Sequence, residues 1–344
     1  MPLTEDALLY LGSAQVAALC RQIDPLQVVT DAFAAVQNGQ AGVTAEAALR
    51  WSAADGSAAR SLILPAWHDD TYGCKIINAC IGNIDRGLPR AHGLMVLYDS
   101  LTAAPVCIME GAHISALRTA AVSVAAIGAV RGFAGLHHLA LLGCGRQSRT
   151  HLHLLAERCP NLTQVSLYDS DPDRGARLVE YARRLLPGSA ITLAPDAEAA
   201  VSAAQVTIAA TTTTTPYVPA QWLPAGATFV NVSLDDATQE LLLECDHLFV
   251  DDWSLVAGDE HRLLGRLARA RHVVGPHDAP LPGARQVNAE LATVLSGAYS
   301  RPITATDRVV VNPFGMGVHD VALAVRIYAA ARDHNDDAGT WLPR

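Results

Sequence analysis

One residue type is almost missing from this chain, and its single occurrence is the first candidate for chemistry. Of 25 basic residues, only Lys75 is a lysine. Arginine serves any surface position that needs only a solvated positive charge, so a bias toward arginine removes lysines that have no special task. Lys75 lies in the mostly apolar run from Tyr72 to Ile77, which indicates a strand. Because a desolvated lysine can exchange protons near neutral pH, we predict a role in proton transfer. A strand lysine whose amine reaches the surface is the alternative.

Three arginines accompany this lysine among the strands of the first third of the chain and the helix that follows them. They are Arg50, Arg90 and Arg118. Charged side chains rarely lie inside proteins unless they meet partners or ligands. A guanidinium matches a carboxylate in a two-pronged pair, and amino acids carry both a carboxylate and an amine. The four cations therefore predict an amino-acid-like substrate, with a structural ion pair as the alternative for each arginine.

A glycine loop in the middle of the chain fits the binding of a dinucleotide. It follows an apolar strand and opens a helix, which is the context that the fingerprint requires. In such a loop the pyrophosphate lies at the helix N-terminus. Serine at the third position, where glycine is usual, is small enough for close packing of the helix on the strand. The loop reads Gly143-Cys144-Gly145-Arg146-Gln147-Ser148.

The acid at the end of the next strand indicates which dinucleotide is bound. Asp169 lies 24 positions after Gly145 (169 − 145), close to the spacing of the acid that bonds the ribose hydroxyls. Such an acid favours NAD over NADP because it repels a 2′-phosphate. Asp171 and Arg174 nearby weaken this preference, since an arginine can accept that phosphate. We predict NAD.

Two later loops of the same region carry hydroxyl and acidic groups. The run Thr211 to Thr215 directly follows the expected strand 206–210, and Asp235 and Asp236 follow the expected strand 229–232. Ligands of parallel sheets bind at the carboxyl ends of the strands. We therefore expect the threonine hydroxyls to meet the cofactor, and an acid to hold a substrate amine or activate water. A polar linker is the alternative for the threonine run.

The elements that must position these residues fall into two patterns. Helices over 13–20 and 24–37, followed by short strands between about 45 and 110, are typical of an α+β unit. A small-residue helix over 113–130 leads to alternating strands and helices, which predict a parallel sheet covered on both faces. A last helix, 319–331, is expected to pack on the first domain. The expected elements of the alternating part are strands 138–142, 164–168, 190–193, 206–210, 229–232 and 247–250, with helices 147–158 and 172–186.

The fold predicted from these patterns is α/β, with a Rossmann-type doubly wound parallel sheet beside an α+β domain. A chain of 344 residues exceeds the usual size of one hydrophobic core. We place the α+β domain at residues 1–120 with 312–344, and the dinucleotide-binding domain at residues 121–311.

Composition excludes several classes of function. A net charge of −9 argues against nucleic acid as a partner. No apolar run looks long enough for a membrane span and no signal peptide is evident, so we expect a cytoplasmic protein. The seven cysteines form no Cys-x-x-Cys pair, which argues against disulfides and zinc. His151 and His153 point to different sides of one helix, so no metal site is predicted.

The chain resembles the ornithine cyclodeaminase/μ-crystallin family over nearly its whole length. The strand lysine, the segment Ser-Ala-Leu-Arg-Thr-Ala-Ala at 115–121, the glycine loop and the acid after a late strand carry the resemblance. Residues 82–83 with 87–91, and the stretches 108–111 and 312–317, are similar to the branch that makes 2,3-diaminopropionate for siderophores and peptide antibiotics. The resemblance also implies a homodimer formed through the first domain.

This resemblance implies a substrate and a reaction. NAD+ would oxidise N-(2-amino-2-carboxyethyl)-L-glutamate at the glutamate Cα, and water would hydrolyse the imine to 2-oxoglutarate and 2,3-diaminopropionate. Lys75 and Asp236 would handle protons and water. Arg50 and Arg118 would hold carboxylate, and we add Arg90 because this substrate has three carboxylates. Asp236 is preferred to its neighbour Asp235 because it lies five residues after Asn231, as in the family. The predicted cofactor contacts are Thr119, Gly143, Cys144, Gly145, Arg146, Gln147, Ser148, Asp169, Thr211, Thr212, Val232, Ser233 and Met316.

Two departures from the family patterns bear on the substrate. Cyclodeaminases that make proline carry Gly-Lys-Thr-Glu after their catalytic acid, whereas residues 237–240 here read Ala-Thr-Gln-Glu. Residues 251–254 differ from the diaminopropionate branch, which usually has histidine, cysteine and arginine there. The alternatives are therefore an ornithine cyclodeaminase, an alanine dehydrogenase, a cyclic imine reductase, and a non-catalytic NAD(P)H-binding protein. Lys75 and Asp236 argue against the last.

Overall fold

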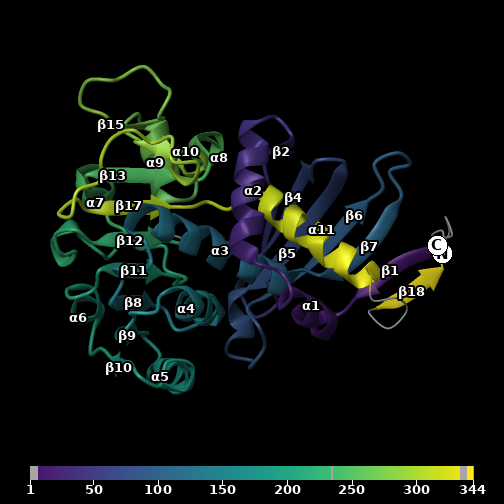
Figure 1. Cartoon of the computed structure of the whole chain (residues 1–344), viewed down its shortest axis with the longest axis horizontal. Helices are drawn as coiled ribbons and strands as arrows, with labels where there is room; N and C mark the ends of the chain where they lie inside the picture. Colours follow the sequence, from purple (N-terminus) through teal and green to yellow (C-terminus); the bar gives the residue numbers. More distant parts are fainter. Residues whose placement is uncertain (1–6, 234, 334–338, 344) are drawn as a thin grey trace. The chain divides into compact units, whose positions relative to one another are not determined.

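The computed structural model describes residues 7–233, 235–333 and 339–343, and the chain divides into two compact units (Figure 1). Unit 1 comprises residues 1–118 and 316–344, and unit 2 comprises residues 119–315. These limits lie two and four residues from the domain boundaries predicted from the sequence, at residues 120 and 312. The first boundary falls inside helix α3 (Gly111–Arg131), and the second follows Gly315, which has a positive φ of 98°.

Unit 1 is built on a mostly antiparallel sheet. Only the β1–β7 pair is parallel in this sheet as described, and β3 pairs with β4 beside the main strand order. The first and last strands in chain order were not predicted, because each is short and gains its partner only from a distant segment. In spatial order the strands are β18 (Thr340–Pro343), β1 (Ala7–Leu11), β7 (Pro105–Glu110), β6 (Ala91–Tyr98), β5 (Thr71–Cys80), β4 (Ala58–His68) and β2 (Ala41–Val43), with β3 at Ala47–Ser52.

Three helices cover the inner face of this sheet. They are α1 (Ser13–Cys20), α2 (Pro25–Gln37) and α11 (Gly317–Asp333). Asp24 begins α2 by accepting a hydrogen bond from the Leu26 backbone N–H at 3.0 Å. Figure 1 shows α11 lying along the sheet beside α2, and α11 contacts β4, β5 and β6. The expectation that the last helix packs on the first domain is confirmed.

The two faces of this sheet differ because side chains alternate along each strand. Inner residues such as Leu64, Met95 and Leu97 are buried. Large apolar side chains on the other face are exposed, among them Ile63 at 39% and Leu94 at 43%. Ile76 pairs with both of them across β5, so the three residues form one apolar row.

Unit 2 contains the predicted doubly wound parallel sheet. Starting from β8, the chain adds β9 and β10 on one side and then β11 and β12 on the other. The order of the strands therefore reverses between β8 and β11. Two strands of this sheet, β17 and β16, were not predicted: β17 lies between β12 and β13, and β16 pairs with the other side of β13. In spatial order the strands are β10 (Ala190–Leu193), β9 (Gln164–Tyr168), β8 (His138–Leu142), β11 (Val206–Ala209), β12 (Thr228–Asn231), β17 (Val309–Asn312), β13 (His247–Val250) and β16 (Ala289–Glu290).

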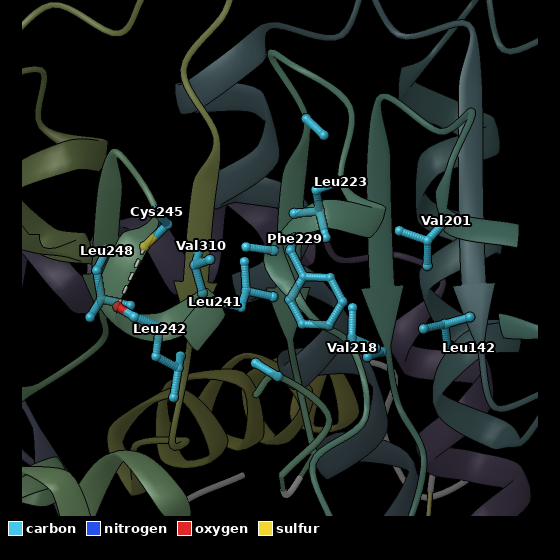
Figure 2. Packing of buried hydrophobic residues seen from close by; sticks show 14 of the residues in the cluster. Leu142, Val201, Val218, Leu223, Phe229, Leu241, Leu242, Cys245, Leu248 and Val310 are labelled. Atoms are coloured by element: carbon cyan, nitrogen blue, oxygen red, sulfur yellow. Dashed lines mark hydrogen bonds between the residues drawn. The ribbon is translucent and has the colours of Figure 1, made fainter. Parts of the chain in front are cut away.

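Helices and one small sheet complete unit 2. An apolar cluster packs against the large sheet, and Figure 2 shows Phe229, Leu241 and Val310 within it. Burying a side chain such as Phe229 contributes about 1.5–3 kcal/mol. The remaining helices are α4 (Arg146–Arg158), α5 (Pro172–Leu185), α6 (Ala197–Val201), α7 (Gln239–Glu244), α8 (Trp253–Gly258), α9 (Leu263–Arg269) and α10 (Leu291–Leu295), and strands β14 (Val273–Val274) and β15 (Arg285–Gln286) pair separately.

Helix α3 corrects the expectation that no apolar run is long enough to span a membrane. It has 21 residues, and its most apolar stretch has a mean hydropathy of 1.4. The same stretch is 72% buried in the protein, as the core helix of a globular protein would be. The helix itself was predicted over 113–130, but its apolar length is not obvious because it comes from many small residues rather than from a run of large ones.

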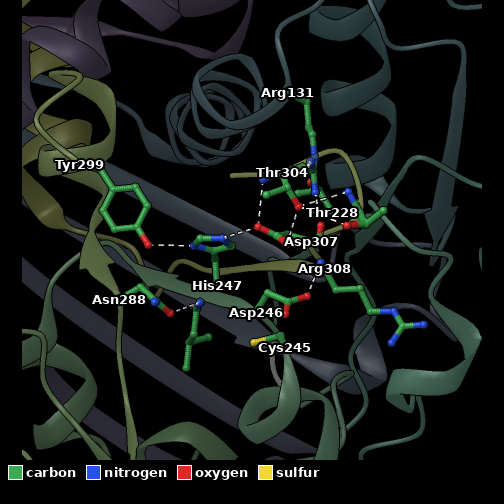
Figure 3. Close-up of polar contacts among 12 residues, drawn as sticks. Arg131, Thr228, Cys245, Asp246, His247, Asn288, Tyr299, Thr304, Asp307 and Arg308 are labelled. Atoms are coloured by element: carbon green, nitrogen blue, oxygen red, sulfur yellow. Dashed lines mark hydrogen bonds and ion pairs between the residues drawn. The ribbon is translucent and has the colours of Figure 1, made fainter. Parts of the chain in front are cut away.

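A polar network lies at the amino ends of the strands of unit 2 (Figure 3). The His247 ring lies between two partners, with Nδ1 2.8 Å from the Tyr299 hydroxyl and Nε2 3.0 Å from Asp307 Oδ2. Arg131 donates from Nε to the Thr228 hydroxyl at 2.9 Å and from Nη2 to the Asp307 carbonyl oxygen. The network ties the end of α3 to the loop before β17.

This network predicts a pH-dependent contribution to stability. Hydrogen bonds from Thr304, and then from His247, hold the pKa of the Asp307 carboxyl well below its ordinary value of 3.8. A lowered pKa in the folded state stabilises the protein above the ordinary pKa, and the contribution is lost as the pH falls toward the lowered value. Asp307→Asn should therefore reduce the free energy of unfolding at pH 7, by an amount that shrinks below pH 3.8. Urea unfolding between pH 7 and pH 3 measures this. Asp70→Asn, in an exposed turn, should show no such trend, and a constant deficit in Asp307→Asn would contradict the prediction.

Candidate active site

The glycine loop of unit 2 lies where the strand order reverses. Gly143 follows β8 with a φ of +82°, a conformation that side chains with a Cβ rarely adopt. A Cβ there would lie 2.9 Å from the carbonyl oxygen of Ala210, at the end of β11. The Gly143 backbone N–H donates to the Tyr168 carbonyl at 2.8 Å. The turn is therefore held between the ends of β9 and β11, and only glycine fits it.

The second glycine of the loop faces open space. Gly145 precedes α4 in an extended conformation, and a Cβ there would meet nothing within 4 Å. Ser148 is fully buried and its hydroxyl donates to the Gly143 carbonyl, so serine performs the packing role of the usual third glycine. An open approach to a helix N-terminus is what a pyrophosphate requires, and the loop fits a dinucleotide.

Asp169 lies beside this loop at the end of β9. One carboxylate oxygen accepts from the Cys144 backbone N–H at 2.6 Å, and the other accepts from the Asp171 N–H at 2.9 Å. Arg174, which weakened the preference for NAD, is paired with Asp171 at 3.0 Å. This candidate partner for a 2′-phosphate is thus already paired with a carboxylate.

The two consecutive acids after β12 have different surroundings. Asp236 is fully buried, and its carboxylate accepts from the Thr211 hydroxyl at 2.6 Å and the Ser233 hydroxyl at 3.3 Å. The Tyr217 hydroxyl is a third hydrogen-bond partner. Burial raises the pKa of Asp236, and the three hydroxyls oppose the rise. An acid with a raised pKa among hydroxyl groups is suited to giving and taking a proton.

Asp235 anchors the next part of the fold instead. It accepts from the Leu263 backbone N–H at 2.7 Å, at the start of α9, and pairs with Arg266 at 3.2 Å. Both carboxylate oxygens are therefore engaged in holding a helix. These contacts favour Asp236 over Asp235 as the reactive acid.

The structure places Lys75 inside unit 1, so the surface alternative is wrong. Lys75 lies on β5 with 2% of its surface exposed. Its Nζ donates to Asp320 Oδ2 at 2.7 Å and to the Ser115 hydroxyl at 3.4 Å. Burial, and then the charge of Arg118, lower the pKa of Lys75 to about 8 despite the opposing effect of Asp320. This amine can both gain and lose a proton near neutral pH.

Arg118 and Lys75 share one carboxylate. The Arg118 Nε donates to Asp320 Oδ1 at 3.1 Å, so the structural ion pair considered for Arg118 is present. The guanidinium has two further nitrogens, and these can form a two-pronged pair with a substrate carboxylate. Sequence reasoning missed Asp320. The available signal was an acid in the apolar first turns of the last helix, because a buried lysine needs a counter-charge.

Arg50 is exposed, which corrects the expectation of a buried cation. It lies on β3 and pairs across the strands with Arg60, which in turn pairs with Ala79 of β5. Ala79 and Lys75 are four residues apart on one strand, so Arg50 shares a sheet face with Lys75. The strand β3 is at the edge of the sheet, and this position leaves Arg50 in solvent.

Arg90 is half-buried at the end of a braced loop. Burial lowers the pKa of its guanidinium. The preceding loop is closed by Asn83, whose side chain donates to the Pro89 carbonyl at 3.1 Å, and by an ion pair between Arg86 and Asp55. A desolvated guanidinium on a braced loop suits a carboxylate ligand.

The other predicted cofactor residues have mixed surroundings. Thr119 belongs to unit 2 and Met316 to unit 1, where Met316 is buried. Arg146 and Thr212 are exposed, and the Val232 N–H donates to the Ala209 carbonyl at 2.9 Å. The Thr211 hydroxyl, expected to meet the cofactor, donates to Asp236. Of the remaining residues, Cys144 and Ser148 are buried, and the Ser233 hydroxyl donates to Asp236. The Oε1 of Gln147 is buried and has no hydrogen-bond partner among the residues that the structure describes.

A doubly wound sheet with a glycine loop at its switch point defines a Rossmann-type protein, and comparison with known proteins refines this class. The chain belongs to the ornithine cyclodeaminase/mu-crystallin family, whose model matches residues 9–335. The resemblance stated from the sequence is confirmed.

Three known proteins illustrate the similarity. The N-((2S)-2-amino-2-carboxyethyl)-L-glutamate dehydrogenase of Staphylococcus aureus is 30% identical over 259 residues, which cover 75% of this chain and 73% of the relative. The crystal structure of CmnK is 33% identical, covers 98% of each chain and has a TM-score of 0.88. An archaeal alanine dehydrogenase, solved as a dimer with bound NAD, covers 98% of this chain and 99% of its own at 23% identity, with a TM-score of 0.79. The last comparison shows the fold alone.

Substitution by alanine should affect a different property at each glycine of the loop: NADH binding at Gly145 and stability at Gly143. Gly145→Ala adds a methyl group to open space at an ordinary φ, so stability should stay unchanged while NADH binding weakens about tenfold or more. Gly143→Ala meets the β11 backbone at a positive φ and should lower the free energy of unfolding by about 1–3 kcal/mol. Fluorescence titration with NADH and urea unfolding measure the two effects. Unchanged NADH affinity in Gly145→Ala would rule out the loop as the dinucleotide site.

Proposed function

We propose that this chain is an NAD-dependent dehydrogenase that oxidatively cleaves N-(2-amino-2-carboxyethyl)-L-glutamate. The observation that carries the proposal is the buried pair of cations in unit 1, Lys75 and Arg118. The pair offers a proton acceptor next to a carboxylate-binding group, which an amino-acid dehydrogenase needs. The similarity to a relative named for oxidising this substrate supports the choice of substrate.

The reaction balances with one cofactor and one water. The substrate, NAD+ and water give 2,3-diaminopropionate, 2-oxoglutarate, NADH and a proton. When bound, NAD+ accepts the hydride that leaves the glutamate Cα. Loss of the hydride leaves a C=N bond, and water adds to its carbon before the C–N bond breaks. The nitrogen departs as the side-chain amine of 2,3-diaminopropionate.

Two side chains are assigned to the protons. Lys75, neutral above a pKa of about 8, takes the proton of the substrate's secondary amine, so that the nitrogen lone pair can drive out the hydride. Asp236 orients the water and returns a proton to the departing nitrogen, a role that its raised pKa favours. Thr211 and Ser233 hold its carboxylate in place.

Three arginines are assigned to the three carboxylates of the substrate. Arg118 holds one beside Lys75, as the family resemblance implies, and Arg50 holds a second from the same face of the sheet. Arg90, desolvated at the end of its braced loop, takes the third. A substrate such as alanine has one carboxylate and would leave this desolvated guanidinium without a ligand. The loop 143–148 and Asp169 are assigned to NAD, and the bound NAD in the alanine dehydrogenase relative supports this assignment.

The reaction predicts a defined outcome for Lys75. Purified protein with NAD+ and the glutamate conjugate should form NADH, followed at 340 nm, and kcat/KM should rise with pH through about 8 as Lys75 loses its proton. Lys75→Ala should lower kcat by about 100-fold or more while NADH still binds. Lys75→Arg is the matched control, because it keeps the charge but cannot give up a proton. An active Lys75→Arg variant would contradict proton transfer, and turnover of ornithine, alanine or a cyclic imine in place of the conjugate would reassign the substrate.

We also propose that unit 1 forms a homodimer through the outer face of its sheet. The apolar row Ile63, Ile76 and Leu94 lies on this face, and an exposed patch of this kind is typical of an interface. A second copy of the chain is the proposed partner, because the family resemblance implies a dimer and the alanine dehydrogenase relative was solved as one.

The dimer can be tested with a matched pair of charged substitutions. Ile63→Glu places a carboxylate in the apolar row, so it should convert the dimer to a monomer in analytical ultracentrifugation. Leu101→Glu changes a side chain that is 91% exposed in the turn between β6 and β7, away from the sheet face, and should leave the dimer intact. A wild-type protein that sediments as a monomer, or a dimer that survives Ile63→Glu, would overturn this interface.

A further inference from the structure

One buried carboxylate joins the two cations on which the proposed function depends. Asp320 lies 2.7 Å from Lys75 Nζ through Oδ2 and 3.1 Å from Arg118 Nε through Oδ1. The three residues come from α11, β5 and α3, and at most 8% of any of them is exposed. Each oxygen of the carboxylate therefore serves a different cation, and the two cations cannot move independently.

We propose that Asp320 is a positioning residue for the reaction: it holds the Lys75 amine and the Arg118 guanidinium side by side in one arrangement that the substrate meets. This inference rests on the proposed function, because it assumes that those two cations contact the substrate. Asp320 itself need not touch the substrate.

The place of Asp320 in the fold favours this role. It is the fourth residue of α11, near the helix N-terminus, where the helix dipole stabilises a negative charge. The first turn of α11 lies tightly on the sheet, since a Cβ at Gly317 would be 3.2 Å from the Leu64 Cβ. A Cβ at Gly73 of β5 would be 3.1 Å from the side chain of Val321, the next residue after Asp320. Small residues on both sides thus allow the close approach that brings the carboxylate to Lys75.

The charges around Lys75 show what Asp320 contributes. Burial and the charge of Arg118 lower the pKa of Lys75, and Asp320 opposes both, with a smaller effect from Glu46. His319, on the same turn of α11, is buried and its pKa lies well below the ordinary value, so it is neutral and adds no charge. Asp320 is therefore the main group that keeps the lysine from losing its proton at a much lower pH.

The lone lysine makes this inference directly measurable. Protein grown with [ε-13C]lysine has one labelled residue, so its NMR signal reports the titration of Lys75 without any assay of activity. The wild-type midpoint should lie near pH 8, and Asp320→Asn should lower it by about one unit or more, because an adjacent opposite charge is removed. Asp333→Asn removes the same charge from the exposed far end of α11 and should leave the midpoint unchanged.

Kinetic measurements show whether Asp320 positions the two cations for the reaction or forms an ion pair that only stabilises the fold. In Asp320→Asn, the pH at which kcat/KM rises should move down together with the NMR midpoint. Asp320→Glu keeps the charge but lengthens the side chain, so the lysine midpoint should stay near the wild-type value while kcat/KM falls about tenfold. NADH titration confirms that each variant is folded. If Asp320→Asn does not fold, the kcat/KM of Asp320→Glu alone decides whether Asp320 positions the two cations.

Two results would overturn the role of Asp320. One is an unchanged lysine midpoint in folded Asp320→Asn, and the other is full kcat/KM in Asp320→Glu. Either would leave the proposed function standing, because wild-type turnover tests it separately. Conversely, a wild-type protein that never forms NADH from the conjugate would contradict the proposed substrate, while the lysine titration would still show whether Asp320 holds Lys75.

Discussion

Removing an ammonium group from water costs several kcal/mol, and the packing of unit 1 compensates this cost for Lys75. The alternation of β5 turns Lys75 toward the inner face, where apolar side chains of β4 and β6 and the helix α11 exclude solvent. The charge is tolerated there because α11 begins close enough to bring a carboxylate to it. The glycines at 73 and 317 are therefore as much a part of this arrangement as the ion pair itself.

In unit 2, the two neighbouring acids Asp235 and Asp236 differ in the partners of their carboxylates. Asp235 uses its oxygens on the backbone and an arginine of α9. Asp236 is surrounded by hydroxyl groups, which stabilise a carboxylate but do not neutralise it as a cation would. Asp169 and Asp171 both accept from backbone N–H groups, but only Asp171 of these two also pairs with an arginine, Arg174.

Much of the architecture could be predicted because its signals are local. The strands of unit 2 up to β12 are short apolar runs bounded by turns, and the glycine loop has its context within a few residues on either side. Strands β1, β17 and β18 could not be predicted in the same way, since each pairs with a segment far away in the chain. The exposure of Arg50 follows from the position of β3 at a sheet edge, and the sequence carries no signal for that.

The candidate site shows the same limit. Lys75 stood out by composition, and Asp236 by its distance from a strand. Asp320 carried a weaker signal, an acid among apolar residues in the last helix, and its contact with Lys75 joins residues 245 positions apart. The choice between Asp235 and Asp236 likewise needed the hydrogen bonds of each carboxylate, which depend on where α9 and the threonine loop lie.

The burial of the only lysine also changes which covalent chemistry the folded protein can undergo. Acylating agents, whether enzymatic or metabolic thioesters, modify exposed lysine amines, and here the one lysine side chain is 2% exposed. Positive charge at the surface is carried instead by guanidinium groups, which such agents do not readily acylate. The folded protein therefore presents no lysine amine at the described surface for such agents to modify.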